Sequence, residues 1–236
     1  MSGASAVIVA AGRGERLGSP KQFLPLGGIP LLMWSVRAFD AHPGIDEVIV
    51  VLPSKSAAAP PHWLEGSAVR WCAGGTTRRE SAGAGVSAAS VESAIILVHD
   101  AARPFVSQGV IGRVIEAASR TGAAIPVLAV VDTIKRLDAG RVQETLIRRE
   151  LGRAQTPQGF DAALIRQLHA RAAEEGSDAS DDAALCERES RPVAAVEGDP
   201  WNLKITTAAD LALAEWLVDS GRVLIPADRE SSGGPV

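Results

Sequence analysis

The sequence has few cysteines, no long apolar run and no excess of basic charge, and each shortage argues against a class of protein. Cys72 and Cys186 are the only cysteines among 236 residues and stand apart, which indicates neither a Cys-x-x-Cys metal site nor a disulfide framework. The longest apolar run, residues 123–131, contains Pro126 and is far shorter than the roughly 20 residues of a membrane-spanning helix. With 24 basic and 28 acidic residues, the chain carries a net charge of −4. We therefore expect no membrane and no nucleic-acid partner.

The overall composition predicts a folded protein of the cytoplasm. Hydrophobic residues make up 46% and charged residues 22% of the chain, close to the average of globular proteins. The first residues lack the basic segment of a signal peptide, and the short apolar run that follows ends in the polar residues 12–16. We therefore expect a single domain in a reducing compartment, with both cysteines unpaired.

Strand and helix patterns alternate along the first half of the chain. Short apolar runs, typical of buried parallel strands, lie at residues 6–10, 47–52, 68–72, 94–98 and 123–131. Helical patterns lie between them, at residues 30–42, 76–89 and 110–119. This alternation predicts an α/β fold: a single Rossmann-like domain with a mainly parallel sheet flanked by helices.

The alternation ends after residue 131. Two short segments, residues 133–137 and 142–146, flank Asp138-Ala139-Gly140 and predict a β-hairpin with a turn of three or four residues. Because an isolated hairpin is not stable in water, we expect residues 132–150 to form a protruding arm that packs onto another surface.

The last third of the chain returns to helical patterns. They lie at residues 162–174, from residue 180, and at residues 207–219, with a strand at 193–196. We expect one domain over residues 1–225 and a loose polar tail over residues 226–236.

A loop of small residues follows the first strand. Backbone amides can approach a phosphate chain closely at four of its positions, Ala10, Ala11, Gly12 and Gly14. Arg16 and Lys21 add two cations, as the charge of a nucleoside triphosphate requires. A strand–turn connection with solvated arginines is the alternative interpretation of the same pattern.

Two better-known phosphate motifs do not match this loop. A dinucleotide fingerprint needs its third glycine where Leu17 stands, one residue before Gly18. A Walker A loop needs lysine directly after that glycine, whereas Lys21 lies three residues later and precedes Gln22.

A second polar motif, His99-Asp100-Ala101-Ala102-Arg103, ends the fourth predicted strand. Ligands of open parallel sheets collect at the carboxyl ends of strands, so we expect this motif and the glycine loop to face one crevice. Taken singly, Asp100 also suits a turn cap and Arg103 a surface ion pair. For His99 we expect packing or a backbone hydrogen bond rather than ligand contact.

Six segments, in order along the chain, resemble the 2-C-methyl-D-erythritol 4-phosphate cytidylyltransferase family. They are AAGRGERLGSPKQF, GGTTRRES, VHDAARPF, DTIKR, RAQTPQGF and GDPWNLKITTAADL. The resemblance covers residues 6–217 and implies transfer of CMP from CTP to methylerythritol phosphate in the non-mevalonate isoprenoid pathway. It also implies Mg²⁺ as cofactor and a homodimer formed through the hairpin arm. The chain is shorter than the fused form that carries a cyclodiphosphate synthase.

The same resemblance implies roles for single residues. Arg16 and Lys21 correspond to the pair that stabilises the α-phosphate and the leaving pyrophosphate, and Arg148 and Lys204 to the pair that holds the substrate phosphate. The implied nucleotide-binding residues are Ala10, Ala11, Gly12, Gly14, Gly75, Ser81, Asp100 and Ala101. The implied substrate-binding residues are Arg103, Thr133 and Thr156. No residue is assigned to the metal.

The chain departs from the family pattern at two places. Thr76 stands where an acidic residue is common, and Ile147 precedes Arg148 where aspartate is common, which leaves Arg149 as an alternative substrate contact. Residues 180–182 match a threonine-acidic-acidic segment, for which we favour helix capping over a catalytic role.

Two other functions stay open at this point. One is a cytidylyltransferase for another alditol phosphate, such as ribitol 5-phosphate. The other is a catalytically silent nucleotide-binding module on the same fold.

Overall fold

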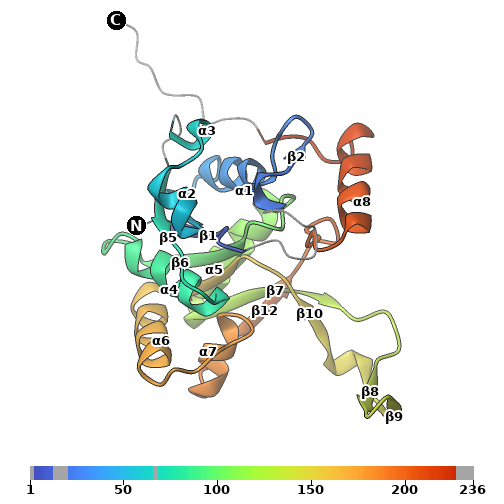
Figure 1. Cartoon of the computed structure of the whole chain (residues 1–236). Helices are drawn as coiled ribbons and strands as arrows, with labels where there is room; N and C mark the ends of the chain where they lie inside the picture. Colours follow the sequence, from blue (N-terminus) through green and yellow to red (C-terminus); the bar gives the residue numbers. More distant parts are fainter. Residues whose placement is uncertain (1–2, 13–20, 66–68, 227–236) are drawn as a thin grey trace, which may run out of the picture.

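An eight-stranded sheet forms the centre of the protein in the computed structural model (Figure 1). The structure describes residues 3–12, 21–65 and 69–226. The strands run in the order β10-β7-β11-β6-β1-β4-β5, and β12 pairs with β7. Their bounds are β1 (Ala4–Val9), β4 (Ile45–Leu52), β5 (Arg70–Ala73), β6 (Ile95–Asp100), β7 (Ala123–Ala129), β10 (Gly152–Ala154), β11 (Gln158–Asp161) and β12 (Ala194–Glu197). The sequence pattern predicts all of them except β10 and β11.

Most neighbouring strands are parallel. β1 runs parallel to β4 and β6, β4 to β5, and β12 to β7, whereas β10 and β11 are antiparallel to their neighbours. Every residue of β6 is buried, and so is every residue of β1 before Val9. Because helices cover both faces of such strands, the strands consist of continuous apolar runs. The predicted α/β class with a mainly parallel sheet is confirmed.

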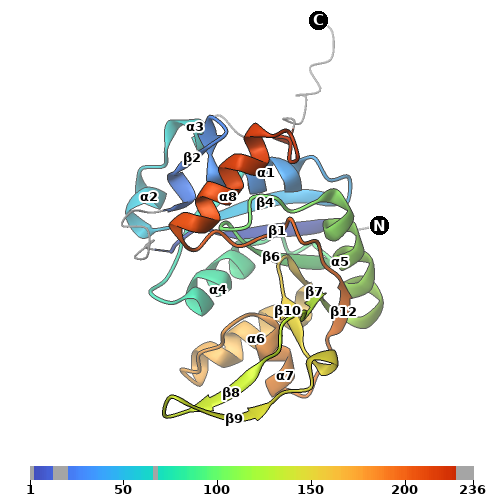
Figure 2. The same cartoon turned by 90° about the vertical axis from the view of Figure 1, so that its right-hand side faces the viewer.

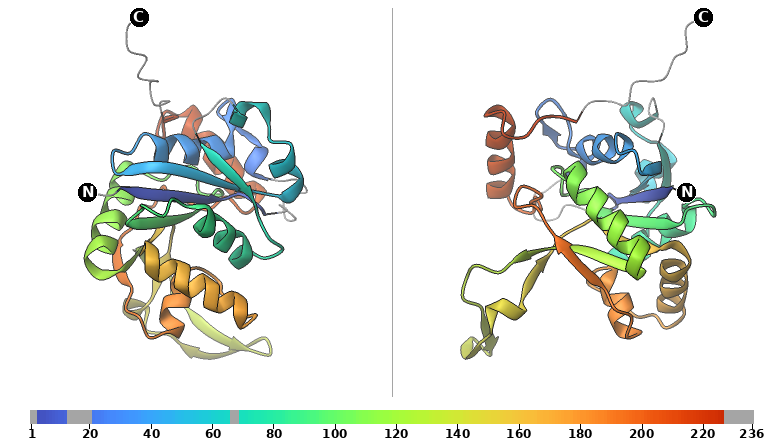
Figure 3. Two further views of the ribbon diagram at one scale, coloured as in Figure 1. Left: turned by 90° about the vertical axis from the view of Figure 1, so that its left-hand side faces the viewer. Right: turned by 180° about the vertical axis from the view of Figure 1, so that it is seen from behind.

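Helices pack on both faces of the sheet (Figures 2 and 3). One face carries α1 (Leu31–Asp40) and α5 (Gln108–Thr121), and the other carries α4 (Arg78–Ala88), α6 (Ala162–Glu174) and α7 (Ala183–Arg188). Consecutive residues of β1 point to opposite faces: Ile8 belongs to the core cluster of α1 and α5, and Val7 to that of α4 and α6. The two hydrophobic cores fix the strand ends from both sides.

A third, smaller core lies beside α1. There α8 (Ala208–Asp219) and the short strands β2 (Pro25–Leu26) and β3 (Ile29–Pro30) enclose Trp34, whose Nε1 donates to the carbonyl oxygen of Leu26 at 2.9 Å. The remaining short elements are α2 (Ser54–Ala58), α3 (His62–Glu65) and the 3-10 helices η2 (Lys21–Phe23) and η3 (Arg148–Glu150). None of the described helices is long and apolar enough to cross a bilayer.

The predicted hairpin is present and extends away from the sheet (Figure 1). β8 (Lys135–Asp138) and β9 (Arg141–Thr145) form a separate two-stranded antiparallel sheet, and all their residues are exposed. Asp138 pairs with Arg141, so the turn has two residues, Ala139 and Gly140, and not the three or four expected. Both have positive φ, at 46° and 77°, which is the conformation of a tight hairpin turn.

The domain limits at residues 1–225 stay a prediction. The expected tail, residues 226–236, lies outside the described residues except for Pro226.

Candidate active site

The first two predicted motifs meet at one edge of the sheet. Val9 and Asp100, the last residues of the parallel strands β1 and β6, are register partners. The amide of Ala101 donates to the carbonyl oxygen of Val9 at 3.1 Å, and that of Ala10 donates to Val51 at 2.8 Å. The small-residue loop and the aspartate therefore leave the sheet side by side, as the sequence predicts.

A third segment closes against this loop before α4. A Cβ atom built on Gly74 would lie 2.5 Å from Cβ of Ala11 and 2.8 Å from Oγ of Ser81, so only glycine permits this approach. Ser81 is buried, and its hydroxyl donates to the carbonyl oxygen of Thr77 at 2.9 Å. At Gly75 a Cβ would collide with Glu80 at 2.3 Å. The backbone at Gly74 and Gly75 therefore lies directly against the side chains of Ala11, Ser81 and Glu80.

Thr76, the departure from the family pattern, takes part in starting α4. Its amide and its hydroxyl both donate to Oε2 of Glu80 at 2.6 Å. Thr77 is the N-cap: its hydroxyl accepts from the amide of Glu80 at 3.1 Å, which completes a capping box. The cap fixes the position of Arg78, the first residue of the helix.

Asp100 is held between two cations. Nζ of Lys204 lies 2.7 Å from its Oδ2, and Nε of Arg78 lies 3.2 Å from its Oδ1. Burial alone would raise the pKa of Asp100, but the charges of Arg78 and Lys204 outweigh it and hold the pKa well below its usual range. Asp100 is therefore ionised at neutral pH, and both of its oxygens are engaged.

Lys204 reaches Asp100 because the chain around it is anchored. Nδ2 of the fully buried Asn202 donates to the carbonyl oxygen of Thr156 at 2.8 Å, and the amide of Ile205 donates to Ala102 at 2.8 Å. The Lys204 side chain remains 41% exposed, so its ammonium lies between the buried carboxylate and the solvent. Such a cation can bind an anionic ligand at the sheet edge.

Arg103 and Thr156 hold the loop that follows β6. Nη1 of Arg103 donates to the carbonyl oxygen of Asn202 at 2.8 Å, and its Nη2 to that of Ala154 at 3.3 Å. Thr156 is buried, and its hydroxyl accepts from the amide of Asp100 at 3.1 Å. His99 is fully buried between Phe39 and Thr156, which confirms the expectation of a packed histidine.

The acidic segment before α7 does not behave as a simple helix cap. Oδ1 of Asp181 accepts from the amide of Ala184 at 3.0 Å and caps the helix. The side chain of Asp182 makes no capping hydrogen bond; it lies 2.9 Å from Nη1 of Arg78 and 3.0 Å from Nε2 of His169. The capping interpretation of residues 180–182 is confirmed for Asp181, whereas tertiary ion pairs take up the carboxylate of Asp182.

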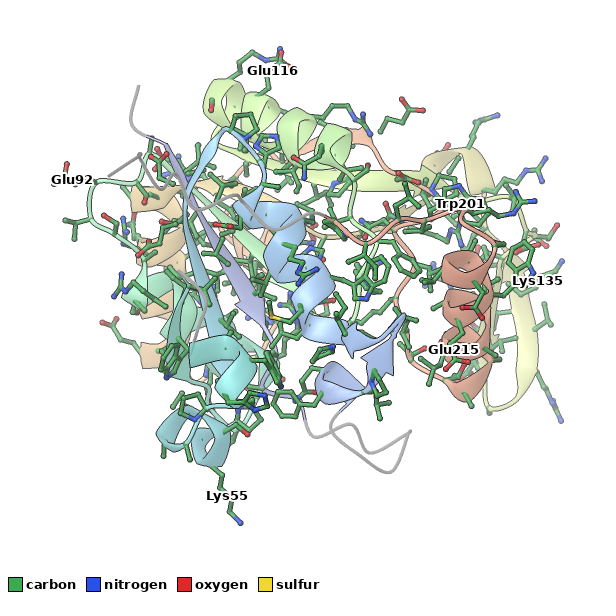
Figure 4. All side chains as sticks on the ribbon, turned by 90° about the horizontal axis from the view of Figure 1, so that it is seen from above. Lys55, Glu92, Glu116, Lys135, Trp201 and Glu215 are labelled. Carbon is green, nitrogen blue, oxygen red and sulfur yellow. The ribbon has the colours of Figure 1, made fainter. Side chains whose placement is uncertain are left out.

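The two predicted site residues on the arm contact neither Asp100 nor Lys204 through any described hydrogen bond within this subunit. Thr133 and Arg148 are exposed, and Nη1 of Arg148 donates to the carbonyl oxygen of Val131 at the base of the arm. Lys135, on β8, lies at the periphery of the molecule (Figure 4).

The two predicted cations of the glycine loop, Arg16 and Lys21, belong to a segment with no described side chains. Gly14 and Arg16 lie outside the described residues, and Lys21 begins η2 with a side chain that is not described. Gly12, the last described residue before them, accepts a hydrogen bond from Nε2 of Gln22 at 3.1 Å.

The fold and the site together define an α/β protein whose small-residue loop and charged side chains gather at the carboxyl ends of two central parallel strands. Comparison with known proteins identifies the family: residues 4–220 match the model of the 2-C-methyl-D-erythritol 4-phosphate cytidylyltransferases. The chain belongs to this family.

Individual relatives agree with the family model. A protein of that name from Thermus thermophilus is 46% identical over 215 residues, which cover 90% of this chain and 96% of the relative. The bifunctional enzyme IspD/IspF of Anaeromyxobacter dehalogenans is 44% identical, and the match covers 91% of this chain but 56% of that enzyme. The chain thus spans about half the length of the bifunctional relative and nearly all of the other.

Solved structures show the same fold. The crystal structure of the cytidylyltransferase from Thermus thermophilus superposes with a TM-score of 0.78 at 43% identity, covering 92% of this chain and 98% of that one. That of 4-diphosphocytidyl-2C-methyl-D-erythritol synthase from Anaerococcus prevotii gives a TM-score of 0.82 at 30% identity, covering 91% and 95%.

Proposed function

We propose that this protein transfers CMP from CTP to 2-C-methyl-D-erythritol 4-phosphate. The products are 4-(cytidine 5'-diphospho)-2-C-methyl-D-erythritol and pyrophosphate. Family membership over residues 4–220 supports the reaction. The observation that carries it to this site is the Lys204–Asp100 pair, which places a half-exposed ammonium beside the small-residue loop after β1.

The reaction needs no nucleophile from the protein. A phosphate oxygen of methylerythritol phosphate attacks the α-phosphorus of CTP, a new P–O bond forms there, and the bond to pyrophosphate breaks. Because both reactants are polyanions, positioning and charge neutralisation supply most of the rate acceleration. The site fits this requirement at Lys204, whose ammonium is partly exposed beside the buried Asp100 carboxylate.

We assign the two substrates to different parts of the edge. The nucleotide lies along Ala10–Gly12 and against the Gly75–Ser81 wall, with Arg16 and Lys21 at its phosphates. The second substrate lies toward Arg103 and Lys204. Lys204 uses one ammonium proton toward Asp100 at 2.7 Å, which leaves two for the substrate phosphate.

We assign Mg²⁺ to the triphosphate itself. Within the described ranges, no three His, Cys, Asp or Glu side chains form a group that could hold a metal ion, and both Asp100 oxygens are engaged by cations. This fits an ion that keeps several waters and binds mainly substrate phosphates. When bound, Mg²⁺ neutralises part of the triphosphate charge.

We further propose that the arm completes the site of a second copy in a homodimer. Its exposed apolar side chains include Leu137 at 64% and Val142 at 61%, which need a covering surface. The two free cysteines are compatible with the reducing cytoplasm in which we place the reaction.

Release of pyrophosphate tests the proposed function. The purified protein is incubated with CTP and Mg²⁺ together with either methylerythritol phosphate or ribitol 5-phosphate. We expect pyrophosphate release in the sample with methylerythritol phosphate and none in the sample with ribitol 5-phosphate. Equal or faster release with ribitol 5-phosphate would identify the other cytidylyltransferase, and CTP binding without any release would identify a silent nucleotide-binding module.

A further inference from the structure

A line of alternating charges runs from the exposed edge of the site into the body of the protein. It begins at Lys204, whose Nζ lies 2.7 Å from Oδ2 of Asp100. Oδ1 of Asp100 lies 3.2 Å from Nε of Arg78, and Nη1 of Arg78 lies 2.9 Å from Oδ2 of Asp182. The line ends at His169, whose Nε2 lies 3.0 Å from Oδ1 of Asp182. It joins segments that are more than a hundred residues apart in the sequence.

Arg78 is the central link of this line. Its guanidinium bridges two carboxylates, and its side chain is 25% exposed, against 12% for Asp100 and 1% for Asp182. Charge-assisted hydrogen bonds of this kind fix both distance and direction. Since each oxygen of Asp100 has its own cation, the carboxylate cannot rotate without breaking one of the two pairs.

The far end of the line is anchored by a buried side chain, that of Gln158. Oε1 of Gln158, a buried residue of β11, accepts from the amides of Asp182 and Ala183 at 3.0 Å each. Nε2 of Gln158 donates to Asp181 at 2.8 Å. This network holds the backbone of Asp182 in place, whereas Lys204 at the other end has a long side chain with many rotamers.

From this geometry we infer that Arg78 is a positioning residue for cytidylyl transfer: anchored on Asp182, it fixes the Asp100 carboxylate, which in turn directs the Lys204 ammonium toward the substrate phosphate. The inference rests on the proposed function and extends it to residues that do not themselves touch the substrate. Without Arg78, Asp100 keeps one cation and can rotate, and the Lys204 ammonium samples several positions. Binding of methylerythritol phosphate suffers, while the nucleotide wall of Gly75 and Ser81 stays intact.

Kinetics of matched variants test this inference. Arg78→Gln, Asp182→Asn and the double variant are compared with Arg171→Gln, because Arg171 also bridges two carboxylates, Glu175 and Glu189, but on the exposed surface of α6. We measure kcat and KM for methylerythritol phosphate at saturating CTP, the Kd of CTP by calorimetry, and the melting temperature of each variant.

For Arg78→Gln we expect kcat/KM for methylerythritol phosphate to fall roughly 10- to 100-fold, the scale of a misplaced binding group, with an unchanged Kd for CTP. For Asp182→Asn the decrease in kcat/KM for methylerythritol phosphate should be smaller. The double variant should be no worse than Arg78→Gln, because both changes break the same line. Arg171→Gln should behave as wild type.

Three outcomes would overturn the inference: wild-type kinetics in Arg78→Gln, a loss confined to CTP binding, or full additivity in the double variant. If Arg78→Gln does not fold, Asp182→Asn decides, since it leaves Arg78 paired with Asp100, and wild-type kinetics there refute the inference. Failure of the proposed function looks different, because the wild-type protein itself would then release no pyrophosphate with methylerythritol phosphate.

Discussion

The hydroxyl of Thr156 lies 3.1 Å from Nδ1 of His99 and joins the segment before β11 to the end of β6. The other ring nitrogen, Nε2, lies 3.0 Å from the carbonyl oxygen of Arg103. A carbonyl oxygen only accepts hydrogen bonds, so Nε2 carries the hydrogen, and Nδ1 of the neutral ring accepts from Thr156. The loop after β6 is therefore held by a histidine whose burial favours the uncharged ring.

This arrangement predicts a pH dependence of stability. Burial lowers the pKa of His99 from 6.5 to about 4. Between these values the unfolded chain binds a proton that the folded chain does not, so the free energy of unfolding decreases as the pH falls from about 6.5 to about 4. The full loss from this one group is about 3 kcal/mol. Urea unfolding at a series of pH values measures it.

His99→Gln is the variant that isolates this contribution. It should be less stable than wild type at pH 7 and should show a flatter dependence in the same pH range. Burial also lowers the pKa of His42, so wild type and variant share that part of the slope. His62→Gln, at an exposed position, is the control and should keep the wild-type slope. Equal slopes in His99→Gln and wild type would refute the prediction.

The N-caps of α4 and α6 allow a matched comparison. Thr77 caps α4 beside the site, whereas Asp161 caps α6 and pairs with Ile95, at the other end of β6 from Asp100. Replacing either capping residue by alanine should cost about 1 kcal/mol of stability. Only Thr77→Ala should also lower kcat/KM, because the start of α4 positions Arg78. Urea titration and steady-state kinetics measure the two effects, and equal activity of both variants would contradict the assignment.

The fold could be predicted largely because buried parallel strands leave a simple mark. Residues 94–98 consist of apolar side chains alone, and the strand they predict is β6, which is entirely buried. β10 was beyond prediction, because Gly152–Ala154 is exposed and pairs only with β7 at the edge of the sheet. In β11 the buried residue Gln158 is polar, and its burial is stabilised by a side-chain hydrogen bond to Asp181. An apolar pattern in the sequence does not reveal such a residue.

The site was predictable where it follows strand ends and unpredictable where it depends on distant contacts. Asp100 and the loop after β1 come together because parallel strands end at one edge. The pairing of Arg78 with Asp182 joins residues 104 positions apart, and it depends on the packing of α6 against both α4 and α7. For Asp182 the local pattern favours capping, and the tertiary ion pair replaced it.

The two cations assigned to the second substrate should act on its binding. Lys204→Ala and Arg148→Ala should raise KM for methylerythritol phosphate far more than KM for CTP, because both remove a cation from the substrate phosphate. Arg120→Ala, at the exposed end of α5, is the control and should leave both constants unchanged. A larger effect on KM for CTP would place these residues on the nucleotide instead.

The glycine loop carries a separate prediction. Arg16→Ala or Lys21→Ala should lower kcat by about 100-fold, the scale of one lost charge stabiliser in the transition state. The Kd of CTP should change less than kcat, if both cations act mainly on the charge that develops at the leaving pyrophosphate. Stopped-flow kinetics with calorimetry separates the two quantities. A near-normal kcat in both variants would show that the loop does not take part in catalysis.

The arm ties assembly to activity. Its strands are exposed throughout, and Ile147, beside Arg148, is 52% exposed, so we expect the arm to pack on a second copy and to place Arg148 in the partner's site. An inactive Lys21→Ala chain and an inactive Arg148→Ala chain, mixed and allowed to exchange subunits, should then regain activity. In each mixed dimer, one site holds both wild-type residues and the other holds neither.

Pyrophosphate release per mixed dimer should therefore approach about half of the wild-type rate, by the two-fold symmetry of the assembly. The matched control mixes the Lys21→Ala chain with a chain that carries both substitutions, a pair that offers no intact site in either arrangement and should stay inactive. Native mass spectrometry establishes that the mixed dimers have formed. If they form and activity does not return, Arg148 serves the site of its own chain, and the arm contributes only to the contact between subunits.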